Sequence, residues 1–208
     1  MSDNNIARVN DVKTSGKVAL SSAVTYSTID VHGKLESDGN LVCSSLSING
    51  KAYIPLRLIA NTVSCKGKIQ ANSIRCNEFC GTGNIEAQTV DADKFTLVLA
   101  SKSKIQRLSA KNIMIEAKEY TQLERSVTAG IFDLFHINYA GEKDHSGFEL
   151  IADEIHGDSV VLENTKAKLV IADHVIIKKN CQIDTLLYSN EYSCESTSDI
   201  MNIRKNII

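Results

Sequence analysis

The chain has 208 residues, with 23 Lys and Arg against 25 Asp and Glu and a formal net charge of −2. This length allows one sizeable hydrophobic core. The balanced charge lacks the basic excess typical of nucleic-acid binders, so we expect no nucleic-acid partner. The hydrophobic fraction is 43%, but aromatic residues make up only 5%, with no Trp and one Pro. This composition excludes a collagen-like or long disordered chain and indicates a core of Val, Ile, Leu and Ala.

The first 25 residues show no regular hydrophobic pattern, and we interpret them as a polar N-terminal arm. This arm has no apolar h-region of the kind that secretory signals carry. The longest apolar run of the whole chain, FTLVLA at 95–100, is far too short to span a membrane. We therefore expect a cytoplasmic protein with reduced cysteines.

A repeat centred on glycine begins within residues 26–115. Apolar and polar residues alternate around each glycine, as in half-buried strands. The glycines at 33, 50, 67 and 83 are separated by steps of 17, 17 and 16 residues. The four repeated segments are Ile29–Leu35, Leu46–Ala52, Val63–Ile69 and Phe79–Ile85.

A second pattern consists of Ala, two polar residues and a β-branched residue. It starts at Ala60, Ala71, Ala87, Ala110, Ala152 and Ala172, at uneven spacing. A coil of 16–17 residues with two or three short strands is too long for a hairpin array and too short for a βαβ unit. We predict an all-β fold, a single-stranded β-helix or solenoid, with corners of variable length and inward aliphatic ladders.

Residues 116–147 interrupt the repeat. Five of the 11 aromatic residues lie between Tyr120 and Phe148, and Ile131, Leu134 and Phe135 have helical spacing. We expect a mixed insertion that either covers one face of the solenoid or contacts a partner or polymer. The candidate contact residues are Phe132, Phe135 and Tyr139.

The strand pattern resumes in C-terminal coils at 148–188 and is followed by a tail at 189–208. Ser198 or Asp199 can N-cap a short helix that uses Ile200, Ile203 and Ile207. We predict that this helix caps the open end of the solenoid.

The sequence contains no P-loop, dinucleotide-binding, nucleophile-elbow or zinc-protease motif. The six cysteines include one close pair, Cys76 and Cys80, whereas zinc sites normally need two. We expect buried thiols and no catalytic, cofactor or metal site. Lys34, Lys51 and Lys68 follow corner glycines and predict a lysine ladder, for which we consider an anionic membrane surface as a partner.

The stretch Ile151–Ala167, IADEIHGDSVVLENTKA, resembles a recurring segment of bactofilin-like, polymer-forming cytoskeletal proteins, particularly the longer Firmicute type. Val175–Asp184 and Tyr188 resemble the same region, and the coils of 29–92 are similar to that family's right-handed β-helix. Relatives tend to have glycine where this chain has Ala172 and Lys178. The resemblance implies a cytoplasmic structural protein that assembles head to tail without nucleotide and scaffolds cell-envelope or motility machinery.

Two alternatives stay open. In the first, the protein is an adaptor that binds one partner through the 116–147 insertion and does not polymerise. In the second, Ile171, Ile177 and Ile183, which recur every six residues, belong to a left-handed hexapeptide-repeat acyltransferase. Binding of acetyl-CoA would support the second alternative.

Overall fold

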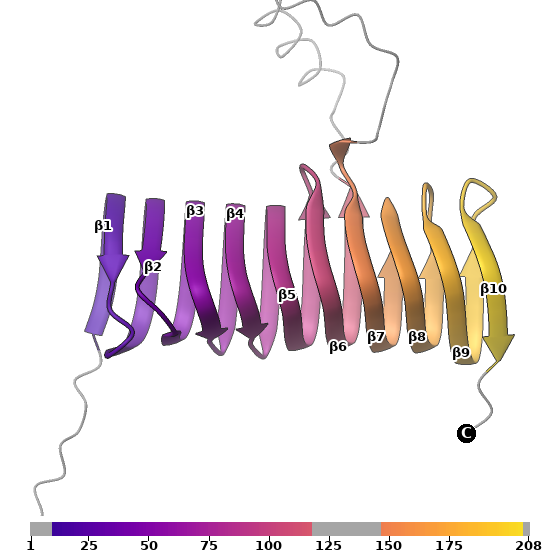
Figure 1. The fold of residues 1–208 in the computed structure, drawn as a ribbon, viewed down its shortest axis with the longest axis horizontal. Coiled ribbons are helices and arrows are strands. Elements are labelled where there is room, and N and C mark those ends of the chain that lie inside the picture. Colours follow the sequence, from indigo (N-terminus) through magenta and orange to yellow (C-terminus); the bar gives the residue numbers. More distant parts are fainter. Residues whose placement is uncertain (1–9, 118–146, 206–208) are drawn as a thin grey trace, which may run out of the picture.

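The computed structural model describes residues 10–117 and 147–205 (Figure 1). Ten strands form one sheet in the order β1 to β10, and each strand pairs in parallel with the next. This confirms the prediction of an all-β solenoid, here of about 10 turns, and the described residues contain no helix. The strands are β1 Asn10–Leu20, β2 Thr25–Ser37, β3 Leu41–Ile59, β4 Thr62–Arg75, β5 Glu78–Leu99, β6 Ser103–Ala117, β7 Leu150–Leu162, β8 Thr165–Ile177, β9 Gln182–Cys194 and β10 Asp199–Lys205.

The interior is a set of aliphatic ladders, as the alternation predicts. Val31, Ile48 and Cys65 occupy one position of successive coils, and each is at most 3% exposed. Successive strands of a sheet lie about 4.8 Å apart, so side chains at one coil position stack directly on one another. Every coil therefore contributes the same few inward side chains to one continuous core.

Glycine is required at one corner by the backbone itself. Gly16, Gly33, Gly50, Gly67 and Gly83 all have positive φ, between 120° and 141°. They are stacked in register from β1 to β5. A Cβ on Gly50 would lie 2.1 Å from the carbonyl oxygen of Gly33, so no side chain fits between the rungs. Asn164 and Asn180 have the positive φ at this corner in the later coils.

The uneven Ala pattern results from two separate corners rather than one. Ala71, Ala87 and Ala152 share one coil position, which Ile105 occupies in β6. Ala110 and Ala172 share another position, with Gly157 between them. Each corner repeats once per coil, and the Ala spacing is uneven because both corners use the same residue types and because the coils differ in length.

Two phenylalanine rings widen the interior at one level. Phe79 and Phe95 stack with ring centroids 4.9 Å apart and an interplanar angle of 16°. Gly81 makes room for them, because a Cβ there would lie 2.8 Å from the Phe79 ring and 3.2 Å from Leu97. The core therefore accepts aromatic rings where the adjacent inward position lacks a side chain.

The structure corrects the expectations for both ends of the solenoid. β1, Asn10–Leu20, pairs with β2, so the solenoid begins at residue 10 rather than 26. At the other end, β10 is a strand paired with β9, so the predicted capping helix is wrong. Ile200 and Ile203 stack on Ile183 and Leu186 of the preceding coil.

Candidate functional site

The N-terminal end of the solenoid is the outer edge of β1. Within the described residues, β1 pairs only with β2, so the backbone groups on its other side face outward. Val12 and Val18 on this strand pack against the core but are only partly buried. Nothing lies within 4 Å of the position that a Cβ on Gly16 would take. This end is therefore an open, parallel strand edge with partly exposed apolar side chains.

The C-terminal end carries three exposed large apolar side chains, among them Met201, the most exposed large apolar side chain of the described residues. Met201 is 72% exposed, Ile203 41% and Tyr192 38%. β10 pairs only with β9 within the described ranges, so it presents a second open edge. Figure 1 places β1 and β10 at opposite ends of the row of coils. An unpaired strand edge is a template for pairing with another chain.

The two ends match in register. β5 contains both Phe79 and Phe95, and the stacking of the two rings shows that these residues occupy the same position in successive coils. The register of β1 to β5 can therefore be continued into β6 to β10. Counting along the chain from these rings places Tyr192 at the coil position of Val12, and Ile200 at that of Leu20. Ser196 falls at the position of Gly16. A second copy that continues the solenoid would thus stack Val12 on Tyr192 and Leu20 on Ile200 at the joint, whereas Val18 would meet Ser198.

Charge is distributed unevenly along the solenoid axis. Residues 10–75 contain 8 Lys and Arg against 4 Asp and Glu, a net charge of +4 with neutral histidines. The described residues from 76 to 205 contain 11 against 15, a net charge of −4. The N-terminal part of the described solenoid therefore carries a net positive charge and the C-terminal part a net negative charge.

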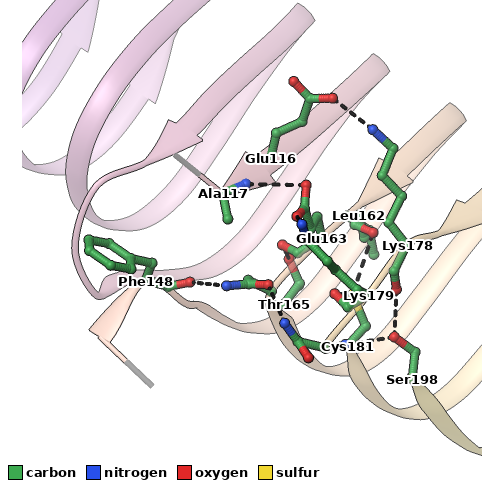
Figure 2. A network of polar contacts seen from close by, with 12 residues as sticks. Glu116, Ala117, Phe148, Leu162, Glu163, Thr165, Lys178, Lys179, Cys181 and Ser198 are labelled. Atoms are coloured by element: carbon green, nitrogen blue, oxygen red, sulfur yellow. Dashed lines mark hydrogen bonds and ion pairs between the residues drawn. The ribbon is translucent and has the colours of Figure 1, made fainter. Parts of the chain in front are cut away.

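Phe132, Phe135 and Tyr139, the candidate contact residues, lie outside the described residues. The described chain breaks off after Ala117 and resumes at Gly147, and the corner around these points is a dense polar network (Figure 2). Glu163 is only 8% exposed at its side chain and accepts a hydrogen bond from the Ala117 amide at 3.4 Å. The Lys179 ammonium lies 3.2 Å from the same carboxylate.

Further contacts fix both sides of this corner. Lys178 Nζ lies 2.8 Å from Glu116 Oε1, and this hydrogen bond raises the pKa of the lysine. On the other side, Asn164 Nδ2 donates to the Phe148 carbonyl at 3.0 Å, and Asn180 Nδ2 donates to Asn164 Oδ1 at 3.1 Å. The points where the chain leaves and rejoins the solenoid are therefore held by side chains of three coils.

Glu149 belongs to the same corner and is almost buried. Its two carboxylate oxygens each lie 3.0 Å from an ammonium group, one from Lys102 and the other from Lys166. Partial burial raises the pKa of Glu149, but the hydrogen bonds from the two lysines outweigh that effect and hold the pKa below its usual value.

The predicted lysine ladder is present and longer than expected. Lys17, Lys34, Lys51 and Lys68 stack in register on β1 to β4. Lys17 and Lys34 share Glu36 at 2.9 and 2.6 Å. Lys68 pairs with Glu86 at 2.7 Å. Carboxylates thus reduce the repulsion that stacked ammonium groups create.

Cys65 and Cys76 point inward, in agreement with the expectation of buried thiols, whereas Cys80 and Cys194 are exposed and correct that expectation. Burial raises the pKa of Cys65 to about 11 and that of Cys76 to about 12. These thiols stay protonated at neutral pH and act as small apolar side chains. In the described part of the chain, no three His, Cys, Asp or Glu side chains cluster closely enough to hold a metal ion.

Comparison with known proteins gives partial similarity to two uncharacterized proteins of Bacillus subtilis (strain 168). YhbE is 45% identical over 51 residues, which cover 24% of this chain and 22% of YhbE. YhbF is 53% identical over 47 residues, which cover 23% of this chain and 19% of YhbF. The matches thus span about a fifth of each relative's length.

No protein-family profile matches the chain, and no solved structure matches it. No helix among the described residues has the length and hydrophobicity needed to cross a membrane. The chain is therefore a β-solenoid with partial similarity to YhbE and YhbF.

Proposed function

We propose that this protein is a non-enzymatic structural scaffold that assembles head to tail, without nucleotide, through the ends of its solenoid. The observation that carries the proposal is the pair of open, parallel strand edges at β1 and β10, which match in register. Pairing of one copy's β1 with the last coil of another satisfies backbone groups at both edges. Because this contact joins two different surfaces, it repeats without closing and gives a filament.

Two further features support this proposal. The opposite charge bias of the two halves favours contact between unlike ends over contact between like ends. The C-terminal stretch Ile151–Ala167 resembles bactofilin-like cytoskeletal proteins, in which a β-helix forms the polymer. Cell-envelope or motility proteins are the partners that this resemblance implies.

Electron microscopy of the purified protein tests the proposal, with light scattering across a range of protein concentrations. We expect filaments, or a mass that increases with concentration. Gly16→Ala is the informative variant. A Cβ on Gly16 has no described atom of its own subunit within 4 Å but would point at Ser196 of the next copy. At the equivalent glycines of the following rungs, a Cβ would lie 2.0–2.2 Å from the carbonyl oxygen of the preceding rung. The variant should stay folded by circular dichroism but lose assembly.

Ser15→Ala is the matched control for this experiment, because it changes an exposed neighbour with no required φ. It should assemble as the wild-type protein does. A wild-type protein that stays monomeric at high concentration would contradict the proposal, and so would a folded Gly16→Ala protein that still forms filaments. A wild-type protein that stays monomeric, and that loses its partner in a pull-down when Phe132 and Phe135 are replaced, would instead favour the adaptor alternative.

A further inference from the structure

A groove of about 600 Å³ runs along the outside of the solenoid across β3 to β6. Its floor includes the inward corner residues Ala71 and Ala87, whose small side chains leave the corner hollow. The groove crosses four rungs, which is about 14 Å at the spacing of strands in a sheet. Its volume lies within the range of ligand sites in proteins.

Two rows of side chains line the groove, one on each side of the floor. One row contains Tyr53, Gln70, Glu86 and Lys104, which pair in register on β3 to β6. The other row contains Pro55, Asn72, Gln88 and Gln106. The groove therefore offers an exposed ring at one end and amides along its length. Beyond it, the next coils carry Asp153 and Lys168, which pair with each other at 2.7 Å.

The amides of the groove have no partners within the described chain. The side-chain amides of Gln70, Asn72, Gln88 and Gln106 make no hydrogen bond to any described residue. This differs from the charged residues nearby, since Glu86 pairs with Lys68 and Lys102 pairs with Glu149. Each free amide offers both donors and an acceptor. Such groups suit a ligand that presents alternating donors and acceptors, as sugar hydroxyls do.

The geometry disfavours other extended ligands. An extended peptide usually binds by adding a strand to a free sheet edge. Here the strand segments of β4 and β5 that form the groove are paired on both sides, so no edge is free. A polyanion needs a basic groove, whereas this lining contains Glu86 beside two lysines, Lys102 and Lys104, and Lys102 pairs with Glu149.

We propose that this groove binds a linear β-1,4-linked glycan lying parallel to the solenoid axis. An extended chain of β-1,4-linked pyranose rings advances per ring by nearly the spacing between rungs, which is about 4.8 Å. Successive rings then lie over successive coils, and because each ring is turned by about half a revolution from the one before, rings of the same orientation meet the amides of every second coil. Tyr53, 46% exposed, supplies an aromatic face for one ring. This binding site is independent of how copies of the protein assemble.

Calorimetric titration tests the proposal with three hexasaccharides: β-1,4-linked N-acetylglucosamine, β-1,4-linked glucose and α-1,4-linked glucose. The last has the composition of the second, but its coiled chain does not match the rungs. We expect binding of at least one β-linked probe and weaker binding of the α-linked probe. Tyr53→Ala should weaken the binding roughly threefold to tenfold, as expected for one ring contact. Gln88→Ala should weaken it roughly fivefold through lost hydrogen bonds.

Met114→Ala and Asn112→Ala are the matched controls, because both residues are exposed on another face of the coils. Both control variants should bind as the wild-type protein does. The proposal is overturned if neither β-linked probe binds at millimolar concentration, or if the α-linked probe binds equally well. It is also overturned if Tyr53→Ala and Gln88→Ala both bind unchanged while folded by circular dichroism.

Discussion

Gly50 illustrates how a single residue position sets the shape of each coil. Its φ of +140° belongs to a region that only glycine occupies readily, and its missing side chain lets the Gly33 carbonyl approach. The backbone conformation and the close contact are separate demands. At Gly16 only the backbone conformation requires glycine, with φ of +120°. A side chain would have space there, because no described atom lies within 4 Å of its Cβ position.

Gly50→Ala should therefore destabilise the fold more than Gly16→Ala does. The Gly16 variant meets only backbone strain, about 1–3 kcal/mol. The Gly50 variant adds displacement of a buried rung, for a total above about 4 kcal/mol. Urea unfolding of both variants under conditions that keep the protein monomeric measures the difference. Equal losses of unfolding free energy in the two variants would show that backbone strain alone explains why glycine is required at this corner.

Glu36 links stability to pH through the lysine ladder. The hydrogen bond from Lys34, followed by that from Lys17, lowers the pKa of this carboxyl from 4.5 to about 2. A carboxyl with a lowered pKa in the folded state stabilises the fold above its unfolded pKa, and this stabilisation is lost as the pH falls through the folded pKa. The contribution is thus present above pH 4.5 and disappears toward pH 2.

Glu36→Gln should lose less stability than the wild-type protein when the pH falls from about 6 to about 2.5. Urea unfolding at the two pH values measures this difference in stability. Glu78→Gln serves as control, because Glu78 is an exposed carboxylate that pairs with one lysine only among the described residues. A carboxyl resonance of Glu36 that titrates near 4.5 in a carbon-13 NMR experiment would contradict the expected pKa.

Among the elements, the middle strands could be predicted from sequence and the terminal strands could not. β2 to β5 carry clear alternation and an aligned glycine. β1 carries the same glycine, Gly16, 17 residues before Gly33, but Thr14 stands where β2 has the buried Val31 and interrupts the apolar pattern. An end strand is covered on one side only, so its sequence needs fewer apolar residues. The glycine step was the signal that could have identified β1.

β10 shows why local spacing can mislead. Ile200, Ile203 and Ile207 fit the spacing of one helix face, and Asp199 is a good N-cap residue. In the structure, Ile200 and Ile203 instead continue the ladders of Ile183 and Leu186. Pairing with β9 satisfies backbone groups of the tail and packs Ile200 against the core. Tertiary contacts of this kind outweigh helix propensity, which is a weak preference.

The groove was not predictable, because it depends on which residues share a corner. Gln70, Glu86 and Lys104 are 16 and 18 residues apart and look like ordinary surface residues in the sequence. Only the register of β3 to β6 brings them into one row. The uneven coil lengths hide this row from any search at a fixed step.

At the scale of the whole molecule, the polarity of assembly is open to a direct chemical test. Head-to-tail continuation of the solenoid places Thr14 of one copy over Cys194 of another, at the Cα spacing that a disulfide requires. Cys194 is an exposed free thiol. Thr14→Cys, in a background with Cys80→Ser, should therefore form disulfide-linked ladders under mild oxidation.

Adding Cys194→Ser to that variant should abolish the ladders, as judged by non-reducing electrophoresis. If the copies met head to head, two introduced cysteines would face each other instead. Dimers that persist after Cys194→Ser would show the head-to-head arrangement and would rule out the joint proposed above.

The pairing of each coil with the one before it also bears on how the protein folds during synthesis. Partners in β1 to β5 are mostly 16 or 17 residues apart, so a new coil can pair as soon as about one more coil of chain has left the ribosome. The short separation also favours fast folding for an all-β chain. β6 and β7 differ, because Ser103 and Leu150 pair across 47 residues. Growth of the solenoid therefore pauses once, after β6, and the first six coils must remain folded by themselves until β7 arrives.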